Sequence, residues 1–472
     1  MKKEKLFGTD GIRGIAGILP ITNEVMYAAG KAIVDVLNTK NKTILIGKDT
    51  RESGDVILTY LKKGIESKNG SVISLGVSTT PAIAYITKTL KAPAGIVISA
   101  SHNPYNHNGI KIFDTHGNKL NEEIENQIEE KIWKYLKKEP LNINLKKSNQ
   151  TTQEKENTKI EQKINQKVND EEKSTKANNN LNELYINHAQ KTIKHKSKSS
   201  IVLDCANGAA YEIAPQILLK CGFQTHLYAN TPNGININEA CGSLHPEKIQ
   251  DLVKKHNAIC GIALDGDADR ITMCDEEGEI LDGDTITALL AAMYHEENKL
   301  SQNTVVLTIM SNQGIINWLE KKGIICIKTK VGDKYLIEEM KKNKYVLGGE
   351  QSGHIIINPY STTGDGIIAG LQIIEYMTKT KKKLSELRKS IPLFPQTLIN
   401  VNVKEKIPLE KLESYYHIKK YEEEVKKSGR VLVRYSGTEQ KCRIMVEHQD
   451  KNKANEYASK IMELLQSEIG EI

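Results

Sequence analysis

Residues 95–104, GIVISASHNP, run from a short β-branched stretch directly into a loop of small polar side chains. Most segments of this kind are followed by a helical pattern, so strands, polar loops and helices alternate along the chain. This alternation predicts α/β domains with largely parallel sheets, in which the loops at the carboxyl ends of the strands form the ligand crevice. The same order recurs in KTILIGKDTRESG (42–54), SIVLDCANGAA (200–210), CGIALDGDADR (260–270), TVVLTIMSNQG (304–314) and KYVLGGEQSGH (344–354).

Length and composition indicate a multidomain protein that handles small anions. At 472 residues the chain is too long for a single core, and its 26% charged and 39% apolar residues are typical of globular proteins. The net charge of +7 is spread along the chain, and only 5% of residues are aromatic. Base-stacking platforms are therefore poorly supplied, so we expect an anionic substrate and no nucleic-acid partner.

The cysteines and the N-terminus favour a cytoplasmic protein without a membrane partner. The seven cysteines are scattered, odd in number and without a C-x-x-C pair, which favours buried free thiols. MKKEKLFGTDGIRG (1–14) lacks the apolar core of a signal peptide. The longest apolar runs, such as ITALLAAMY (286–294), are too short to span a bilayer.

Two regions depart from the α/β pattern. Residues 141–180 contain no aromatic, Gly, Pro, Cys or Met and few apolar side chains, so we expect a polar, low-complexity insertion between domains. From about Ser390 the chain changes to alternating strands around a turn, as in LINVNVK (398–404) and GRVLVRYSGTEQKCRIMVEH (429–448). These strands predict a separate, small α+β domain.

The loop LDGDADR (264–270) predicts a metal site. Asp265, Asp267 and Asp269 recur at every second residue, so in an extended loop their carboxylates converge and repel one another. A divalent cation removes this conflict, and an all-oxygen ligand set selects a hard ion, Mg²⁺ or Ca²⁺. An EF-hand is disfavoured because Arg270 replaces the required glycine and strands flank the loop.

Ser101, in SASHNP, is the candidate phosphoryl carrier. A phosphate on Ser101 would repel the three acids, so a cation must bridge them. A polar turn with Ser101 as a cap is the simpler alternative, and a triad hydrolase is disfavoured because no G-x-S-x-G elbow surrounds Ser101.

Three further loops carry candidate binding residues. Arg434, Ser436, Gly437, Thr438 and Arg443 surround a tight turn and supply guanidinium groups, hydroxyls and backbone N–H groups for a phosphate. In GGEQSGH (348–354), Glu350 and Ser352 are able to contact sugar hydroxyls or an amine. In FGTDGIRG (7–14), Arg13 is either an ordinary loop charge or a phosphate ligand.

Taken in order, FGTDGIRG, SASHNP…NGIK, DGDADR, GGEQSGH and RYSGTE resemble the signatures of the α-D-phosphohexomutase superfamily. The resemblance implies four domains around a central cleft: three α/β domains with mixed sheets and a C-terminal, TATA-binding-protein-like α+β domain. We accordingly expect domains at 1–140, 181–281, 282–389 and 390–472, with the insertion at 141–180.

The same resemblance implies roles for individual residues. Ser101 would be the phosphoserine, and Mg²⁺ would be held by that phosphate with Asp265, Asp267 and Asp269. Lys111 would be the general acid or base, with a pKa lowered by burial, beside Arg13 and His102. Glu350, Ser352 and His354 would contact the sugar. Arg270 is counted among the site residues without a specified role, and the phosphate that is not reacting would be bound by Arg434, Ser436, Gly437, Thr438 and Arg443.

Within this resemblance, GEQSGH and the N-terminal FGTDGIRG imply a phosphorylated hexosamine as substrate, converted between its 6- and 1-phosphates, with glucose or mannose phosphates of the same superfamily as the alternative. We expect a monomer or a homodimer. A haloacid-dehalogenase-type phosphatase with an Asp nucleophile and a non-catalytic sugar-phosphate sensor are rival functions. Ala268 in place of a frequent Gly, and the absence of Pro after Glu439, depart from the superfamily pattern.

Overall fold

The structure is a computed structural model that describes residues 5–8, 10–138, 181–426, 428–436 and 440–470. The expected insertion at 141–180, Gly437 and Thr438 lie outside these residues. The strand segments recognised in the sequence are strands in the structure, and each is followed by its polar loop. None of the helices in the described ranges has the length and apolar character needed to cross a membrane.

Domain 1 is a six-stranded sheet between two helical layers, with strand order β1-β2-β6-β5-β3-β4. β3 pairs in parallel with β4 and β5, whereas β6 pairs antiparallel with β5 and β2. Successive side chains of β3 point to opposite faces of the sheet and enter two different hydrophobic cores. Ile44 and Ile46 pack with α1, α2 and α4, while Leu45 packs with α3. The elements are β1 (Phe7–Gly8), β2 (Gly11–Ile15), α1 (Asn23–Val36), β3 (Thr43–Lys48), α2 (Gly54–Glu66), β4 (Ser71–Val77), α3 (Thr80–Leu90), β5 (Ala94–Ile98), β6 (His107–Asp114) and α4 (Glu122–Lys138).

Domains 2 and 3 carry mixed sheets of five and four strands, in the orders β11-β10-β9-β7-β8 and β13-β12-β14-β15. Each has a parallel centre (β8-β7-β9 and β13-β12-β14) and an antiparallel edge. Domain 2 contains η1 (Gln190–Thr192), β7 (Ser200–Asp204), α6 (Ile213–Lys220), β8 (Gln224–Tyr228), α7 (Glu247–His256), β9 (Cys260–Leu264), β10 (Ile271–Asp275) and β11 (Ile280–Leu281). Domain 3 contains α8 (Gly283–Glu296), η2 (Ser301–Asn303), β12 (Thr304–Thr308), α9 (Gln313–Lys321), β13 (Ile325–Thr329), α10 (Asp333–Asn343), β14 (Leu347–Gly349), β15 (Ile355–Ile357), α11 (Gly366–Thr380) and α12 (Leu384–Lys389).

Domain 4 is a three-stranded antiparallel sheet, ordered β16-β18-β17, with two helices on one face. Val431 and Val433 of β17 pack with these helices, so Arg430 and Arg434 lie on the opposite face. The elements are β16 (Gln396–Asn402), η3 (Leu409–Lys411), α13 (Ser414–Val425), β17 (Gly429–Tyr435), β18 (Lys441–His448) and α14 (Lys451–Ile469).

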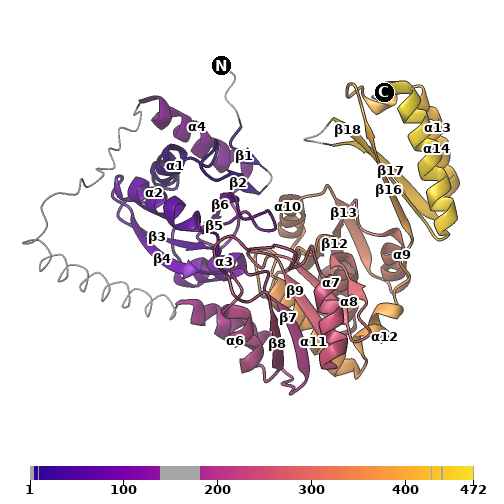
Figure 1. The fold of residues 1–472 in the computed structure, drawn as a ribbon, viewed down its shortest axis with the longest axis horizontal. Helices are drawn as coiled ribbons and strands as arrows, with labels where there is room; N and C mark the ends of the chain where they lie inside the picture. The colour runs from indigo at the N-terminus through magenta and orange to yellow at the C-terminus, as the bar shows by residue number, and fades with distance from the viewer. Residues whose placement is uncertain (1–4, 9, 139–180, 427, 437–439, 471–472) are drawn as a thin grey trace, which may run out of the picture.

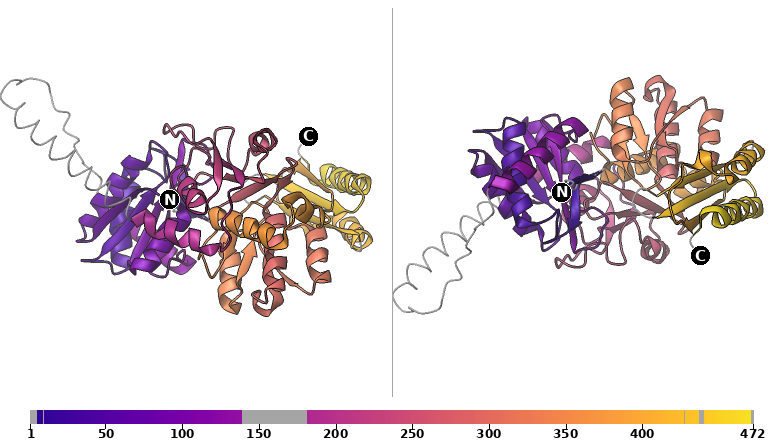
Figure 2. Two further views of the ribbon diagram at one scale, coloured as in Figure 1. Left: turned by 90° about the horizontal axis from the view of Figure 1, so that it is seen from below. Right: turned by 90° about the horizontal axis from the view of Figure 1, so that it is seen from above.

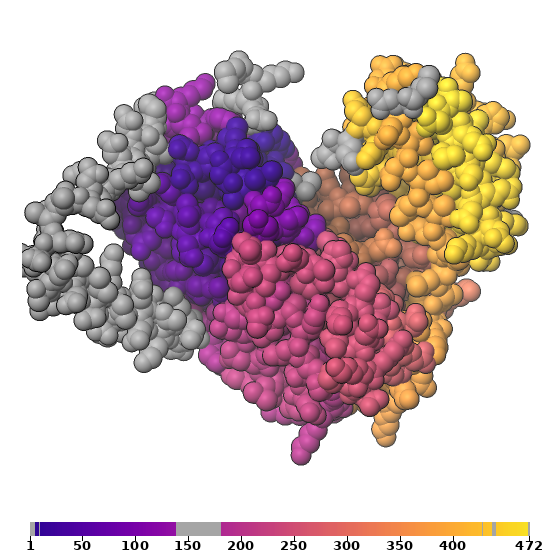
Figure 3. Space-filling model, viewed as in Figure 1, coloured from indigo at the N-terminus to yellow at the C-terminus, as the bar shows by residue number. Residues whose placement is uncertain are grey.

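The four domains surround a central hollow. Figure 3 shows the hollow between domain 1, in indigo and purple, and domain 4, in yellow, with domain 3 at its floor. Figure 1 shows α13 and α14 on the outer side of domain 4, so the arginine-bearing face of its sheet turns toward this hollow. Figure 2 shows that domains 2 and 3 lie between domains 1 and 4 in both further views. The expected four-domain architecture is therefore confirmed.

Candidate active site

The loop after β5 holds Ser101 in a strained backbone conformation. Ser101 has φ of +53°, in the left-handed region that L-residues rarely adopt. Its backbone is fixed from both sides: its N–H donates to Ser99 Oγ at 2.9 Å, and its carbonyl accepts from Asn238 Nδ2 at 2.9 Å and Arg51 Nη2 at 3.2 Å. Because these partners come from both domain 1 and domain 2, the loop is held at the junction of the two domains.

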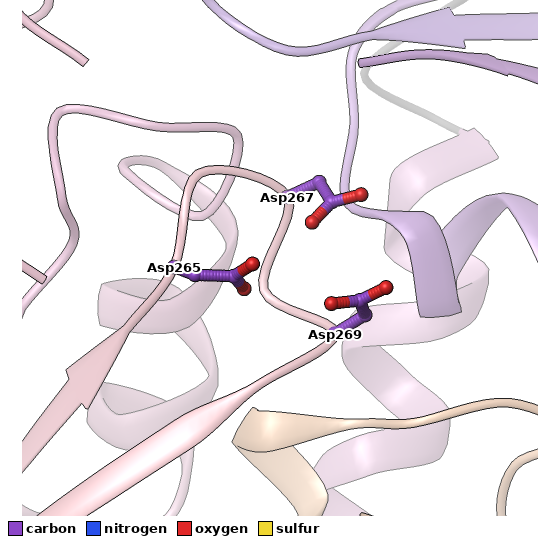
Figure 4. A group of neighbouring side chains, drawn as sticks. All are labelled: Asp265, Asp267 and Asp269. Atoms are coloured by element: carbon purple, nitrogen blue, oxygen red, sulfur yellow. The ribbon is translucent and has the colours of Figure 1, made fainter. Parts of the chain in front are cut away.

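The carboxylates of the three aspartates converge in one loop (Figure 4). One ligand oxygen from each of Asp265, Asp267 and Asp269 lies within 4.8 Å of the others, and all three side chains are buried. Ser101 Oγ donates to Asp265 Oδ2 at 2.5 Å, so the serine and the aspartates share one site. Ala268, inside this loop, has φ of +59°, so the loop turns back on itself rather than staying extended.

The donor set fits a hard divalent cation such as Mg²⁺. Within the described residues, Asp267 Oδ1 and Asp269 Oδ1 are buried without a hydrogen-bond donor. Burial, Asp269 and Asp267 together hold the pKa of Asp265 well above its usual range. Unpaired carboxylate oxygens and an acid that resists ionisation both indicate that the neighbouring cations leave part of the negative charge unbalanced, and an oxygen-coordinated cation supplies the rest.

Lys111 corrects one expectation. Its ammonium lies 2.8 Å from Asp267 Oδ2, 2.8 Å from Asp269 Oδ2 and 3.3 Å from Asp10 Oδ2, and its side chain is buried. Burial alone lowers the pKa of Lys111, as the sequence analysis assumed, but these three carboxylates outweigh it and raise the pKa well above its usual value. The prediction of a lowered pKa was wrong, because the sequence does not show that Asp10 and the acidic loop lie close to Lys111.

The neighbours of Ser101 include one neutral base and two further cations. His102 Nδ1 lies 3.3 Å from Ser101 Oγ, and burial, Arg270 and Arg13 lower the pKa of His102 to about 4. Its imidazole is therefore neutral near pH 7. Arg13 pairs with Asp10 and lies 3.5 Å from the Ala100 carbonyl, and Arg270 follows the metal loop directly, its N–H donating to Asp265 Oδ1 at 3.1 Å.

The predicted sugar loop lies beside the same site. Glu350, after β14, is buried and accepts from the Gly332 N–H at 2.9 Å, whereas Ser352 is exposed. His354 is buried with Nδ1 3.8 Å from Asp269 Oδ2, and its Nε2 accepts from the Gly364 N–H at 3.1 Å. The loop of domain 3 thus reaches the acidic loop of domain 2.

Several charged residues in this network were missed by the sequence analysis. Asp10 links Lys111, Arg13 and Lys119, and Lys119 also pairs with Asp333 at the start of α10. These contacts extend the charge network from domain 1 into domain 3. The motif FGTDGIRG contained Asp10, and its position three residues before Arg13 was the available signal.

The second group of predicted residues lies on domain 4. Arg434 and Arg443 are directly opposite each other in the β17–β18 pair, and Ser436 N–H bonds to the Lys441 carbonyl at 2.8 Å at the end of the hairpin. Figure 1 shows that this end of β17 and β18 borders the hollow, across from domain 1. The structure therefore gathers Ser101, the three aspartates, Lys111, Arg13, His102 and His354 in one cluster and keeps Arg434, Ser436 and Arg443 on a separate domain.

Comparison with known proteins matches the four-domain architecture. Models of the phosphoglucomutase/phosphomannomutase family match the chain in order: α/β/α domain I at 4–139, domain II at 183–278, domain III at 282–394 and the C-terminal domain at 398–464. Phosphoglucosamine mutase of Clostridium acetobutylicum is 42% identical over 468 residues, covering 98% of this chain and 99% of the relative. The chain belongs to the phosphoglucosamine mutases of the phosphohexomutase superfamily.

A second mutase of this group, from Geotalea uraniireducens, is 42% identical over 472 residues and covers 99% of each chain. The relatives support the hexosamine interpretation over the glucose or mannose alternative. Among solved structures, a Burkholderia thailandensis phosphoglucomutase/phosphomannomutase family protein has a TM-score of 0.75 at 19% identity, covering 98% of this chain and 97% of the other. Aspergillus fumigatus N-acetylphosphoglucosamine mutase, solved with GlcNAc-6P and magnesium, has a TM-score of 0.64 at 17% identity, covering 98% of this chain and 96% of the other.

Proposed function

We propose that the chain interconverts glucosamine 6-phosphate and glucosamine 1-phosphate, with phosphorylated Ser101 as the phosphoryl donor. One observation carries the residue assignment: the 2.5 Å contact between Ser101 Oγ and Asp265, one of three converging buried carboxylates. A phosphate on this oxygen would face the acidic loop across a domain boundary. That arrangement requires a cation between them, as expected for metal-assisted phosphoryl transfer.

Mg²⁺ would be held by Asp265, Asp267, Asp269 and the phosphate on Ser101. When bound, it supplies charge neutralisation and Lewis-acid polarisation of the phosphoryl oxygens. The A. fumigatus relative was solved with magnesium, which supports this choice of ion. Lys111 and Arg13 contribute fixed positive charge around the same phosphate, since both lie within the carboxylate network.

The phosphoryl group would pass from Ser101 to the 1-hydroxyl of glucosamine 6-phosphate, giving a 1,6-bisphosphate that turns in the cleft and returns its 6-phosphoryl group. Lys111 holds a proton as an ammonium beside Asp267 and Asp269, and it would serve as the acid. The neutral imidazole of His102, beside Ser101 Oγ, is able to accept the proton of the Ser101 hydroxyl when the 6-phosphoryl group returns. Catalysis would rest mainly on positioning and charge neutralisation.

Substrate would be held at two further points. Glu350, Ser352 and His354 would contact the sugar ring from domain 3. Arg434, Ser436, Gly437, Thr438 and Arg443 would bind whichever phosphate is not reacting, from domain 4. Two phosphate sites on separate domains suit a bisphosphate that must present each end to Ser101 in turn.

A coupled assay with glucosamine, glucose and mannose 6-phosphates tests the substrate. We expect the highest kcat/KM with glucosamine 6-phosphate, and a higher value with either other sugar would contradict the proposal. Phosphopeptide mapping tests the carrier: a hydroxylamine-stable phosphate on Ser101 supports it. A hydroxylamine-labile acyl phosphate on an aspartate would instead favour the dehalogenase-type phosphatase.

We also propose a cytoplasmic monomer or homodimer that does not bind nucleic acid. All seven cysteines are free and six are buried, which suits a reducing compartment. Sedimentation and salt-dependent DNA titration test the oligomeric state and the absence of nucleic-acid binding.

A further inference from the structure

Domain 4 is linked to domain 3 by an arginine whose three guanidinium nitrogens all donate hydrogen bonds. Arg430, on β17, donates from Nη1 to the Ile309 carbonyl at 2.6 Å and from Nη2 to the Ser311 carbonyl at 2.6 Å. It also bonds to Glu447 on β18, from Nε at 2.6 Å and from Nη2 at 3.1 Å. Because two nitrogens of the planar group bond the carboxylate, the pair fixes the orientation of the two side chains as well as the distance between them.

Glu447 completes the attachment from the neighbouring strand. Its side chain is fully buried, and its Oε2 accepts from the backbone N–H of Gln313, the first residue of α9, at 3.0 Å. Its Oε1 accepts from Gln396 Nε2, at the start of β16, at 2.9 Å. Arg430 and Glu447 together therefore bind the loop 309–313 of domain 3, the arginine at its carbonyls and the glutamate at the helix N-terminus.

The chain that connects the two domains is held by the same loop. Asn312 Nδ2 donates to the Phe394 carbonyl and Asn312 Oδ1 accepts from the Phe394 N–H, both at 3.0 Å. Gly314 permits this approach, because a Cβ there would lie 2.1 Å from the Pro392 carbonyl oxygen. The connection and the sheet are thus fixed at one place, which we call the joint: loop 309–313 with Phe394, Arg430 and Glu447.

The joint and the predicted phosphate-binding arginines share two strands and one face. Arg430 is paired with Glu447, and four residues further along, Arg434 is paired with Arg443. Four residues of strand span about 13 Å, so a turn of about 5° at the joint would move the arginines by roughly 1 Å. Displacements of this size matter for substrate positioning.

We propose that Arg430 and Glu447 are positioning residues, which hold domain 4 at the angle that brings Arg434 and Arg443 to the phosphate not reacting at Ser101. The inference rests on the proposed function for the identity of that phosphate. It predicts that the guanidinium fork, and not its charge alone, is required. Lysine keeps the charge but is unable to bond two carbonyls and both carboxylate oxygens.

The test compares Arg430→Lys with the matched control Arg388→Lys in the full-length protein. The two arginines are similarly exposed, Arg388 at 21% and Arg430 at 17%. The carboxylate partners of Arg388, Asp275 at 2.7 Å and Glu277 at 3.7 Å, lie in domain 2 and not at the joint. For Arg430→Lys we expect KM for glucosamine 6-phosphate to rise about tenfold, with kcat changed less than about threefold. Arg388→Lys should leave both constants near the wild-type values.

A second measurement follows the domain angle itself. Spin labels at Glu123→Cys on α4 and Glu463→Cys on α14, in a Cys326→Ser background because the other cysteines are buried, report the distance between domains 1 and 4. We expect a broader or shifted distance distribution in Arg430→Lys and an unchanged one in Arg388→Lys.

Unchanged KM in Arg430→Lys, with or without a lower melting temperature, would overturn the inference, since a merely structural pair affects folding alone. A raised KM with an unchanged distance distribution would also overturn it. If the wild-type protein did not act on glucosamine 6-phosphate, the proposed function would fail, while the spin-label distances would still decide the role of the joint.

Discussion

In the proposed function, the cluster around Ser101 and the arginine edge of domain 4 each bind a phosphate group, but they are built differently. The Ser101 cluster draws buried side chains from domains 1, 2 and 3 and holds Ser101 in a strained backbone conformation. The arginine edge consists of two cross-strand residues on one sheet, attached to the rest of the chain at the joint. Phosphoryl transfer, assigned to the Ser101 cluster, requires a rigid site from which water is excluded. The arginine edge would bind a phosphate that must also be released, which requires a site able to open.

The largest effect should come from removing the nucleophilic oxygen in the cluster. Ser101→Ala should lower turnover by about 10⁴-fold or more, because no phosphoryl carrier remains. Binding of glucosamine 6-phosphate, measured by calorimetry, should stay within a few fold of wild type because the arginine edge is intact. Near-normal turnover would contradict the division between the two regions.

Asp267→Asn should reduce turnover by about 10³-fold and remove its dependence on added Mg²⁺. The carboxamide keeps the shape of the side chain but withdraws one negative ligand from the site. Metal titration of the variant provides the check, and Asp275→Asn, on β10 and outside the cluster, provides the control. Retained metal affinity would place the ion elsewhere.

The buried carboxyl group of Asp365 should make the free energy of unfolding depend on pH. Asp365 is fully buried at the start of α11, accepts from Tyr185 Oη at 2.9 Å, and burial raises its pKa to about 7 from 3.8. Burial favours the protonated, neutral form of Asp365 in the folded state. The contribution of this group to the free energy of unfolding is therefore fully present below pH 4 and is lost as the pH rises to 7. Asparagine does not ionise, so the free energy of unfolding of Asp365→Asn minus that of wild type should increase by on the order of 2–4 kcal/mol from pH 4 to pH 8. Urea unfolding at the two pH values measures this difference. An equal difference at both pH values would contradict this.

At the arginine edge, the effect should fall on binding. Arg434→Gln should raise KM about 30-fold and change kcat little, because a charge-assisted phosphate contact is lost far from the reacting bond. Arg388→Gln is the control. A fall in kcat matching that of Ser101→Ala would show that the two regions act as one.

The smallest effect should come from Ala268→Gly. Alanine at φ of +59° is strained, and glycine relieves that strain at the expense of a more flexible unfolded chain. We expect a gain of about 0.5 kcal/mol or less in the free energy of unfolding, with activity unchanged. Destabilisation by more than about 1 kcal/mol would show that the loop depends on the alanine methyl group.

Local patterns in the sequence predicted the α/β domains and the metal loop because the decisive spacings are short. Asp265, Asp267 and Asp269 lie within five residues, and the strand before them fixes where they point. Ser101 was selected as a candidate for the same reason, as a hydroxyl that closely follows the β5 strand.

Contacts between distant segments were not predicted. The raised pKa of Lys111 depends on Asp10, about a hundred residues earlier, and on the acidic loop, about a hundred and fifty later. Arg430 and Glu447 looked like ordinary polar positions of alternating strands, and only the packing of domain 4 on loop 309–313 distinguishes them.

The central claim is that a single cation is bound by both the phosphate on Ser101 and the three aspartates. Electron-nuclear double resonance on the phosphorylated protein with Mn²⁺ in place of Mg²⁺ measures this directly. We expect a ³¹P hyperfine coupling of the size given by a directly coordinated phosphate, present in wild type and lost in Asp267→Asn. Bound Mn²⁺ without ³¹P coupling in the phosphorylated wild-type protein would contradict the account.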